Sequence, residues 1–389
     1  MIRTFAAAGV VAMAATAAIA DAGKIKVGFV DSFSGPNALI GNEKKEAFEL
    51  ALDHLGRKMG GLDVVTVYED DQQKPDVGKQ VTDKLIQSDK VDVLTGYNWS
   101  NVLLASVKSA VDSKTFLISA NAGPSQLAGE QCSPYFFATS WQNDQTPMAL
   151  GELLNKKGIK KLFVLAPNYA AGKDMAVGVK KTFKGEVVGE EYTRWPGQVD
   201  FSTELSKVRS VKPDALWVFY PGQAGVQFVQ QYNQAGLKDQ VPLYSSFTVD
   251  ATTLPQIKDQ GLGQISTQSW VADQDNEANK KFVGDFKKKY GRYPSYYAAQ
   301  TYDAAMLINS AVVATKGKVD DKEAFRKALE KADFKSVRGK FAFNTNHFPI
   351  QDFFSQEVVK DKDGDITQKS TGVIFADAKD AFADKCTMK

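Results

Sequence analysis

Short apolar runs rich in β-branched residues alternate along this chain with longer stretches in which apolar residues recur every three or four positions. One run, residues 91–96, is typical of a buried strand of a parallel sheet. The stretch after it carries Leu103, Val107 and Val111 at four-residue spacing, which predicts a helix with Ser100 at its N-cap. Strands that alternate with helices of this length indicate βαβ units, and therefore an α/β fold with parallel sheets.

This alternation occurs twice along the chain. The expected strands are residues 24–30, 64–68, 91–96 and 115–119 in the first half, and residues 161–166, 187–192, 215–220 and 243–246 in the second. Two α/β units are therefore expected, which suits 389 residues at about 150 residues per domain.

The pattern changes from about residue 270 onward. Apolar spacing predicts a helix over residues 278–290, and Ser295 is expected to cap a second helix. Asp320 with Glu323 three positions later forms a capping-box pattern before a third helix. Residues 358–366, with an Asp-Gly turn, predict a β-hairpin near the end of the chain.

The turn after residues 91–96 is the first candidate for a binding site. Ligands of open α/β sheets bind where parallel strands end, and the free N–H groups of a helix N-terminus favour an anion. Asn98, Trp99 and Ser100 stand at that position and could orient a small organic acid. An ordinary strand-to-helix turn with a capping serine fits the spacing equally well.

Composition and the N-terminus define the class of protein and its compartment. The chain is 43% hydrophobic and 24% charged with a net charge of +2, and no basic patch favours nucleic acid. Residues 1–20 carry one charge, Arg3, and end in Ala-Ile-Ala, which predicts a cleaved signal peptide and a periplasmic mature protein. A retained membrane anchor is the alternative, although no other run of about 20 apolar residues follows.

The two cysteines are Cys132 and Cys386. An oxidising compartment permits a disulfide between them, which would attach the C-terminal tail to the middle of the chain. Two buried free thiols are the alternative.

Residues suited to catalysis or to metal binding are scarce. His54 and His347 are the only histidines, so spacing assembles no metal-ligand cluster, and no Gly-x-Ser-x-Gly elbow occurs. We therefore expect neither an enzyme nor a cofactor.

The ordered set of short motifs resembles a known family. These motifs are Ser34-Gly35-Pro36, the strand ending at Gly96, Ser100, residues 118–122, Tyr169-Ala170-Ala171-Gly172 and Tyr302-Asp303-Ala304. Together they resemble the leucine/isoleucine/valine-binding type of periplasmic solute-binding protein. The resemblance implies two Rossmann-like lobes joined by three hinge crossings near Ser140, Trp270 and Phe341. It also implies a monomer that delivers a small molecule to the membrane permease of an ABC transporter.

The family pattern also implies where the lobes divide. After the signal peptide, residues 21–140 plus 271–340 would form the N-terminal lobe. Residues 141–270 plus 341–389 would form the C-terminal lobe.

Several pocket positions follow from the resemblance. Ser100 matches the serine that holds the ligand carboxylate, and Tyr169 matches the tyrosine that covers the ligand from the second lobe. Asn121 stands where a backbone carbonyl is usually offered. Phe247 stands where amino-acid binders carry the acid that pairs with the ligand ammonium, and Gly123 replaces their threonine.

These departures favour an aromatic carboxylate over an amino acid. A buried ammonium without a counter-charge costs several kcal/mol, and Phe247 supplies a ring face instead of a charge. Aromatic side chains could sandwich a flat ring, and Asn98, Asn121 or Asn143 could hydrogen-bond to it. The candidate ligand-binding residues are Asn98, Trp99, Ser100, Asn121, Ala122, Trp141, Tyr169, Tyr220, Phe247 and Tyr297.

Other interpretations stay open from the sequence. Trp99, Tyr220, Phe247 and Tyr297 could serve core or lobe packing instead of a ligand. A branched-chain or other amino acid could bind if Asp31 or Asp273 paired with its ammonium. A ligand-sensing module is a further alternative, and an exported enzyme on the same fold lacks a catalytic set.

Overall fold

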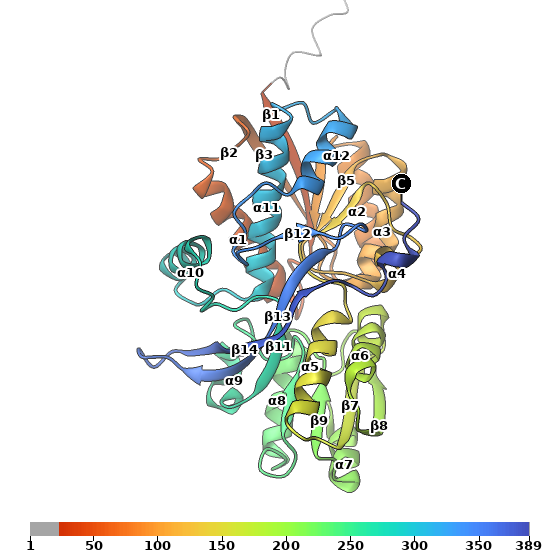
Figure 1. The fold of residues 1–389 in the computed structure, drawn as a ribbon, viewed down its shortest axis with the longest axis vertical. Coiled ribbons are helices and arrows are strands. Elements are labelled where there is room, and N and C mark those ends of the chain that lie inside the picture. The colour runs from red at the N-terminus through yellow and green to blue at the C-terminus, as the bar shows by residue number, and fades with distance from the viewer. Residues whose placement is uncertain (1–22, 389) are drawn as a thin grey trace, which may run out of the picture.

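The computed structural model describes residues 23–388, which form two α/β lobes stacked along the long axis of the molecule (Figure 1). The expected signal peptide lies outside the described residues. Within them, no helix is long and apolar enough to cross a membrane.

The first lobe is built on a six-stranded sheet of order β2-β3-β1-β4-β5-β6. Its strands are β1 (Lys24–Asp31), β2 (Lys58–Met59), β3 (Leu62–Asp70), β4 (Val93–Gly96), β5 (Phe116–Ser119) and β6 (Phe136–Ala138). All neighbours are parallel except β2, which pairs antiparallel with β3. Its helices are α1 (Ala38–His54), α2 (Pro75–Gln87), α3 (Ser100–Asp112), α4 (Ser125–Ala128), α10 (Glu277–Tyr290), α11 (Tyr296–Ala314) and α12 (Lys322–Lys331).

Alternation along the strands separates two apolar layers in this lobe. Val93 and Ile118 face the core that contains α1 and α11, whereas Leu94 and Leu117 face the core that contains α2 and α3. Because successive side chains of a strand point to opposite faces, a run that is apolar throughout requires helices on both sides of the sheet.

The second lobe is built on a sheet of order β12-β13-β11-β10-β9-β7-β8, with β14 paired to β13. Its strands are β7 (Lys161–Pro167), β8 (Glu186–Thr193), β9 (Ala215–Val218), β10 (Leu243–Ser245), β11 (Ile265–Gln268), β12 (Ala342–Phe343), β13 (Pro349–Lys360) and β14 (Ile366–Ala378). Strands β7 to β11 run parallel, and β13 joins antiparallel. Its helices are α5 (Gln145–Lys156), α6 (Ala170–Thr182), α7 (Ser202–Val211), α8 (Gln223–Gln234), α9 (Leu254–Ile257) and the 3₁₀ turn η1 (Lys258–Gly261).

The chain passes between the lobes after β6, after β11 and after α12, and its tail passes between them once more after β14. This topology confirms the predicted fold class. The exact lobe boundaries stay a prediction. The tail after β14 returns to the first lobe, where the 3₁₀ turn η2 (Ala383–Lys385) lies beside the disulfide that joins Cys132 to Cys386.

Most predicted element boundaries agree with the structure, and two N-caps need comment. Ser295 caps α11 by accepting a hydrogen bond from the Tyr297 N–H, as expected. Helix α12 is capped by Asp321, so the prediction of Asp320 was one residue early. The hairpin of β13 and β14 is confirmed and is longer than residues 358–366.

Candidate ligand-binding site

A small cavity lies between the lobes, where the carboxyl ends of β4 and β5 face those of β7, β9 and β10. The cavity offers about 20 Å³ of space, roughly enough for one water molecule. The lining residues are Asn98, Trp99, Ser100, Asn121, Ala122, Trp141, Asn143, Tyr169, Ala171, Met175, Phe219, Pro221, Phe247 and Tyr297.

Two helices, one from each lobe, begin at this cavity. Trp99 is the N-cap of α3 and Tyr169 is the N-cap of α6, and neither side chain caps its helix. Ser100 is therefore the first residue of α3, which corrects the prediction that it is the N-cap. The first N–H groups of both helices and the positive ends of their dipoles face the cavity without a side-chain cap.

Ser100 is held by a hydrogen bond from the first crossing segment. The Asn143 Nδ2 donates to Ser100 Oγ over 3.1 Å, and Asn143 Oδ1 accepts from the Gly123 N–H over 3.2 Å. Ser100 and Asn143 are both buried. The serine hydroxyl is thus oriented by an amide that is itself fixed at both ends.

The Asn121 side chain is also fixed at both ends. Its Nδ2 donates to the Asn98 carbonyl over 2.8 Å, and its Oδ1 accepts from Gln300 Nε2 over 2.7 Å. Asn121 therefore links the loop after β4 to helix α11, and it lines the cavity with an amide that already makes one hydrogen bond at each end.

Trp99 is supported by a chain of polar groups behind the cavity. Its Nε1 donates to Ser32 Oγ over 2.8 Å, and the Ser32 hydroxyl donates to Asp71 Oδ1 over 2.5 Å. Burial and, to a lesser extent, the nearby negative charge of Asp31 raise the pKa of Asp71 to about 7. The indole ring is therefore oriented by a hydroxyl and a buried carboxyl group.

The second lobe presents rings to the cavity. Phe247 stacks on Trp141 with a centroid distance of 4.6 Å and meets Phe219 edge-on at 5.9 Å. Tyr169 stacks on Trp195 at 4.4 Å, and Trp195 contacts Trp99 of the first lobe at 5.2 Å. Aromatic contacts thus continue from one lobe to the other.

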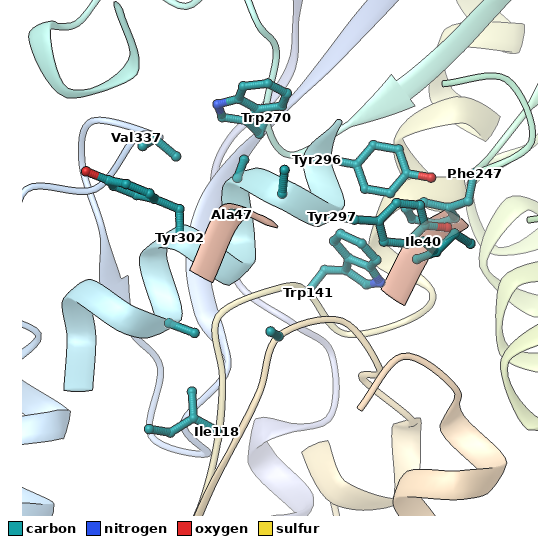
Figure 2. Packing of buried hydrophobic residues seen from close by; sticks show 14 of the residues in the cluster. Ile40, Ala47, Ile118, Trp141, Phe247, Trp270, Tyr296, Tyr297, Tyr302 and Val337 are labelled. Atoms are coloured by element: carbon teal, nitrogen blue, oxygen red, sulfur yellow. The ribbon is translucent and has the colours of Figure 1, made fainter. Parts of the chain in front are cut away.

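Tyr296 and Tyr297 of α11 complete the aromatic wall. Figure 2 shows Tyr297 gathered with Trp141, Phe247 and Ile40. The Tyr296 hydroxyl turns away to Asp250 Oδ2, to which it donates over 2.7 Å, and burial raises the pKa of Asp250. Tyr297 therefore faces the cavity, whereas Tyr296 packs behind it.

Among the described residues, no charged side chain lines the cavity. Asp31 pairs with Lys44 over 2.5 Å, and both are fully buried behind the site. Asp273 accepts from the Ser370 N–H at the surface of the second lobe. Neither candidate partner for an ammonium reaches the cavity. Within residues 23–388, no group of His, Cys, Asp or Glu side chains could hold a metal ion.

Comparison with known proteins identifies the family. The model of the periplasmic binding protein family matches residues 24–365. This chain belongs to that family. A curated relative, Leu/Ile/Val-binding protein homolog 6 of Brucella melitensis, is 28% identical over 92% of this chain and 93% of its own length.

Two solved structures of ABC transporter solute-binding proteins are similar along nearly the whole chain. An ABC transporter solute-binding protein from R. palustris, in complex with benzoate, is 33% identical with a TM-score of 0.89, covering 94% of this chain and 100% of that one. Another from Rhodopseudomonas palustris BisB5, in complex with 3,4-dihydroxybenzoic acid, is 28% identical with a TM-score of 0.85, covering 92% and 99%.

In this periplasmic binding protein every predicted site residue except Tyr220 lines the cavity. Tyr220 packs instead against Phe201 and Phe228 in the core of the second lobe, with centroid distances of 4.8 and 5.2 Å. Successive side chains of an extended segment point to opposite sides, so Phe219 faces the cavity and its neighbour does not.

The sequence analysis missed five contributors to this site. Phe219, Pro221, Ala171 and Met175 line the cavity, and Trp195 stacks behind Tyr169. These four residues lie at or after the ends of the predicted strands 161–166 and 215–220, so the strand ends are the signal that could have identified them. Trp195 lies in a loop after β8, and the residues next to it in the sequence do not distinguish it from a surface aromatic residue.

Proposed function

We propose that this protein is the extracytoplasmic substrate-binding component of an ABC-type uptake transporter and binds a small aromatic carboxylate between its lobes. The observation that carries the proposal is the lining of the cavity. Its described residues are uncharged and are aromatic on the second-lobe side, and two helices have their N-termini there. The protein binds its ligand as a monomer and releases it unchanged to the membrane permease subunits.

The carboxylate of the ligand is placed at Ser100 and the first N–H groups of α3. A helix N-terminus carries about half a positive charge, which suits an anion in a site that has no cationic side chain. The ring of the ligand lies among Trp141, Tyr169 and Phe247, where each favourable ring contact adds about 1 kcal/mol beyond the burial of area.

An amino acid suits this cavity poorly. Its ammonium would be buried with no carboxylate on the lining, which costs several kcal/mol. The solved relatives with benzoate, 4-hydroxybenzoate and 3,4-dihydroxybenzoic acid support the same class of ligand.

Binding on this scheme is coupled to movement of the lobes. The space of about 20 Å³ is far smaller than a benzoate molecule. The lobes therefore open to admit the ligand and close with the rings repacked around it. We place this cycle in the periplasm, after removal of residues 1–20.

A ligand screen tests the proposal directly. Mature protein is melted with benzoate, 4-hydroxybenzoate and 3,4-dihydroxybenzoate, and in parallel with leucine, valine, phenylalanine and glutamate, followed by calorimetry on each hit. A ligand at 100 times its Kd adds about 2.7 kcal/mol to the free energy of unfolding. We expect the aromatic acids alone to raise the melting temperature. A larger shift with leucine or valine would overturn the assignment of the ligand class.

A further inference from the structure

One carboxylate of the second lobe joins the two lobes beside the cavity. Asp174 of α6 accepts the Ser125 N–H over 3.0 Å and the Ser125 hydroxyl over 2.9 Å, and Ser125 begins α4 of the first lobe. Asp174 also accepts from Asn143 Nδ2 over 3.1 Å. The same Nδ2 donates to Ser100 Oγ, so Asp174 lies one hydrogen bond from Asn143 of the cavity lining and two from Ser100 Oγ.

The chemistry of these groups fixes the direction of each hydrogen bond. A carboxylate only accepts, so the Asn143 atom that faces Asp174 is its NH₂ group. This orientation agrees with the opposite end of the amide, where Oδ1 accepts from the Gly123 N–H. Both Nδ2 protons are then used, one on Asp174 and the other on Ser100 Oγ.

These hydrogen bonds determine whether the Ser100 hydroxyl donates or accepts toward the cavity. Its oxygen already accepts a hydrogen bond from Asn143, and within residues 23–388 its own proton has no acceptor. The Ser100 hydroxyl is therefore left to donate into the cavity, next to the N–H groups that begin α3. A ligand group at this point must accept hydrogen bonds.

We propose that Asp174 is a positioning residue that sets the hydrogen-bond polarity of the site and selects a carboxylate over a group that also donates. The inference rests on the proposed function and adds the residue that determines this specificity. Asp174 touches no ligand and acts through Asn143 and Ser100. Because Asp174 also accepts from Ser125 across the lobes, the closed arrangement of the lobes holds its carboxylate in place.

Charge alone makes the opposite prediction. Asp174 is negative and lies near the proposed position of the ligand carboxylate, so its removal by Asp174→Asn would tighten benzoate if repulsion dominated. If orientation dominates, an amide oxygen at position 174 holds the Asn143 NH₂ group less firmly than the carboxylate does, the Ser100 hydroxyl is free to turn, and benzoate binds more weakly. The sign of the change in Kd therefore separates the two effects.

The test measures Kd by calorimetry for benzoate and for benzamide, which has the same shape but donates from its NH₂ group. We expect Asp174→Asn to weaken benzoate about tenfold and to lower the preference for benzoate over benzamide by a similar factor. The control is Asp200→Asn, an exposed carboxylate that accepts from the Ser202 N–H at the start of α7 and should change neither Kd. Tighter benzoate binding, or equal weakening of both ligands, would overturn the proposal.

A second variant and a ligand-free measurement keep the two proposals separate. Ser125→Ala removes one of the hydrogen bonds to Asp174 and should weaken benzoate about threefold. The NMR signals of the Asn143 NH₂ group report its orientation without ligand; they should shift in Asp174→Asn and stay unchanged in Asp200→Asn. If wild type binds no aromatic acid, the proposed function fails, while unshifted Asn143 signals would remove Asp174 from its role independently.

Discussion

The two walls of the cavity are built by different means. The first lobe and the crossing segment provide polar groups, namely Asn98, Ser100, Asn121 and Asn143, and most of them are tied by hydrogen bonds of 2.7 to 3.2 Å. The second lobe provides Tyr169, Phe219 and Phe247, and the rings of Trp141 and Tyr297 join them in the aromatic wall. One wall sets the orientation of a ligand, and the other supplies contact area.

Both walls follow a turn with a left-handed non-glycine residue, Tyr97 with φ of 55° after β4 and Phe247 with φ of 57° after β10. Such a conformation costs a non-glycine residue about 1–2 kcal/mol. The walls differ in what surrounds these turns. The polar wall is tied by hydrogen bonds, whereas Phe247 packs between the rings of Trp141 and Phe219, so the apolar wall depends on mutual packing of its rings.

The largest effect is expected from Phe247→Ala, which breaks the apolar wall. The variant loses the ring between Trp141 and Phe219, and buried Phe→Ala changes cost about 3–5 kcal/mol. Both the free energy of unfolding and the affinity for benzoate should fall, as measured by urea unfolding and calorimetry.

The matched control is Phe228→Ala, which removes a buried ring from the core of the same lobe but not from the cavity. It should lower stability by a similar amount and leave Kd within about twofold. If both variants lost affinity equally, the rings of the second lobe would affect benzoate binding only by stabilising the fold and not by contacting the ligand.

A smaller, pH-dependent effect is expected behind the polar wall, from Asp71→Asn. The native pKa of about 7 lies above the ordinary value of 3.8, because burial disfavours the charged form. The native state therefore keeps a proton that the unfolded chain releases. This group's contribution to stability is complete below about pH 4 and is lost as the pH rises to about 7, at roughly 1 kcal/mol per pH unit.

Urea unfolding at pH 5 and pH 8 checks this prediction. Wild type should lose stability between these values relative to Asp71→Asn, which has no proton to release. Asp112→Asn, at an exposed ion pair with Lys108, should follow wild type. Parallel curves for Asp71→Asn and wild type would mean that this carboxyl group is not the source of the pH dependence.

The fold was predictable because its signals are local. Apolar β-branched runs and four-residue helical spacing recur with the period of each element, so strand and helix types could be read without tertiary information. The one-residue error at Asp321 has a simple cause. Two adjacent aspartates can each accept the N–H groups of a helix start, and only the backbone conformation selects between them.

The site was predictable where strand ends define it and not where side-chain direction does. Residues 97–100 follow directly from the end of β4. Tyr220 was wrongly placed at the cavity because a shift of one residue along an extended segment turns a side chain from one face to the other. Strand β9 ends at Val218, before Tyr220, so the strand pattern in the sequence does not determine which face Tyr220 occupies. Trp195 could not be found, since its contact with Trp99 exists only once the two lobes are together.

Ser100→Ala tests the polar wall with the smallest structural change. The substitution removes a hydroxyl from the first position of α3 and leaves the helix N–H groups in place. The free energy of benzoate binding should become less favourable by about 1–3 kcal/mol, the value of a hydrogen bond to a charged group, while the melting temperature changes little. Ser113→Ala, at the other end of α3, is the control, because its hydroxyl donates to the Ala110 carbonyl and should leave Kd unchanged. Equal affinities for Ser100→Ala and wild type would place the carboxylate elsewhere, and the division between an orienting wall and a contact wall would not hold.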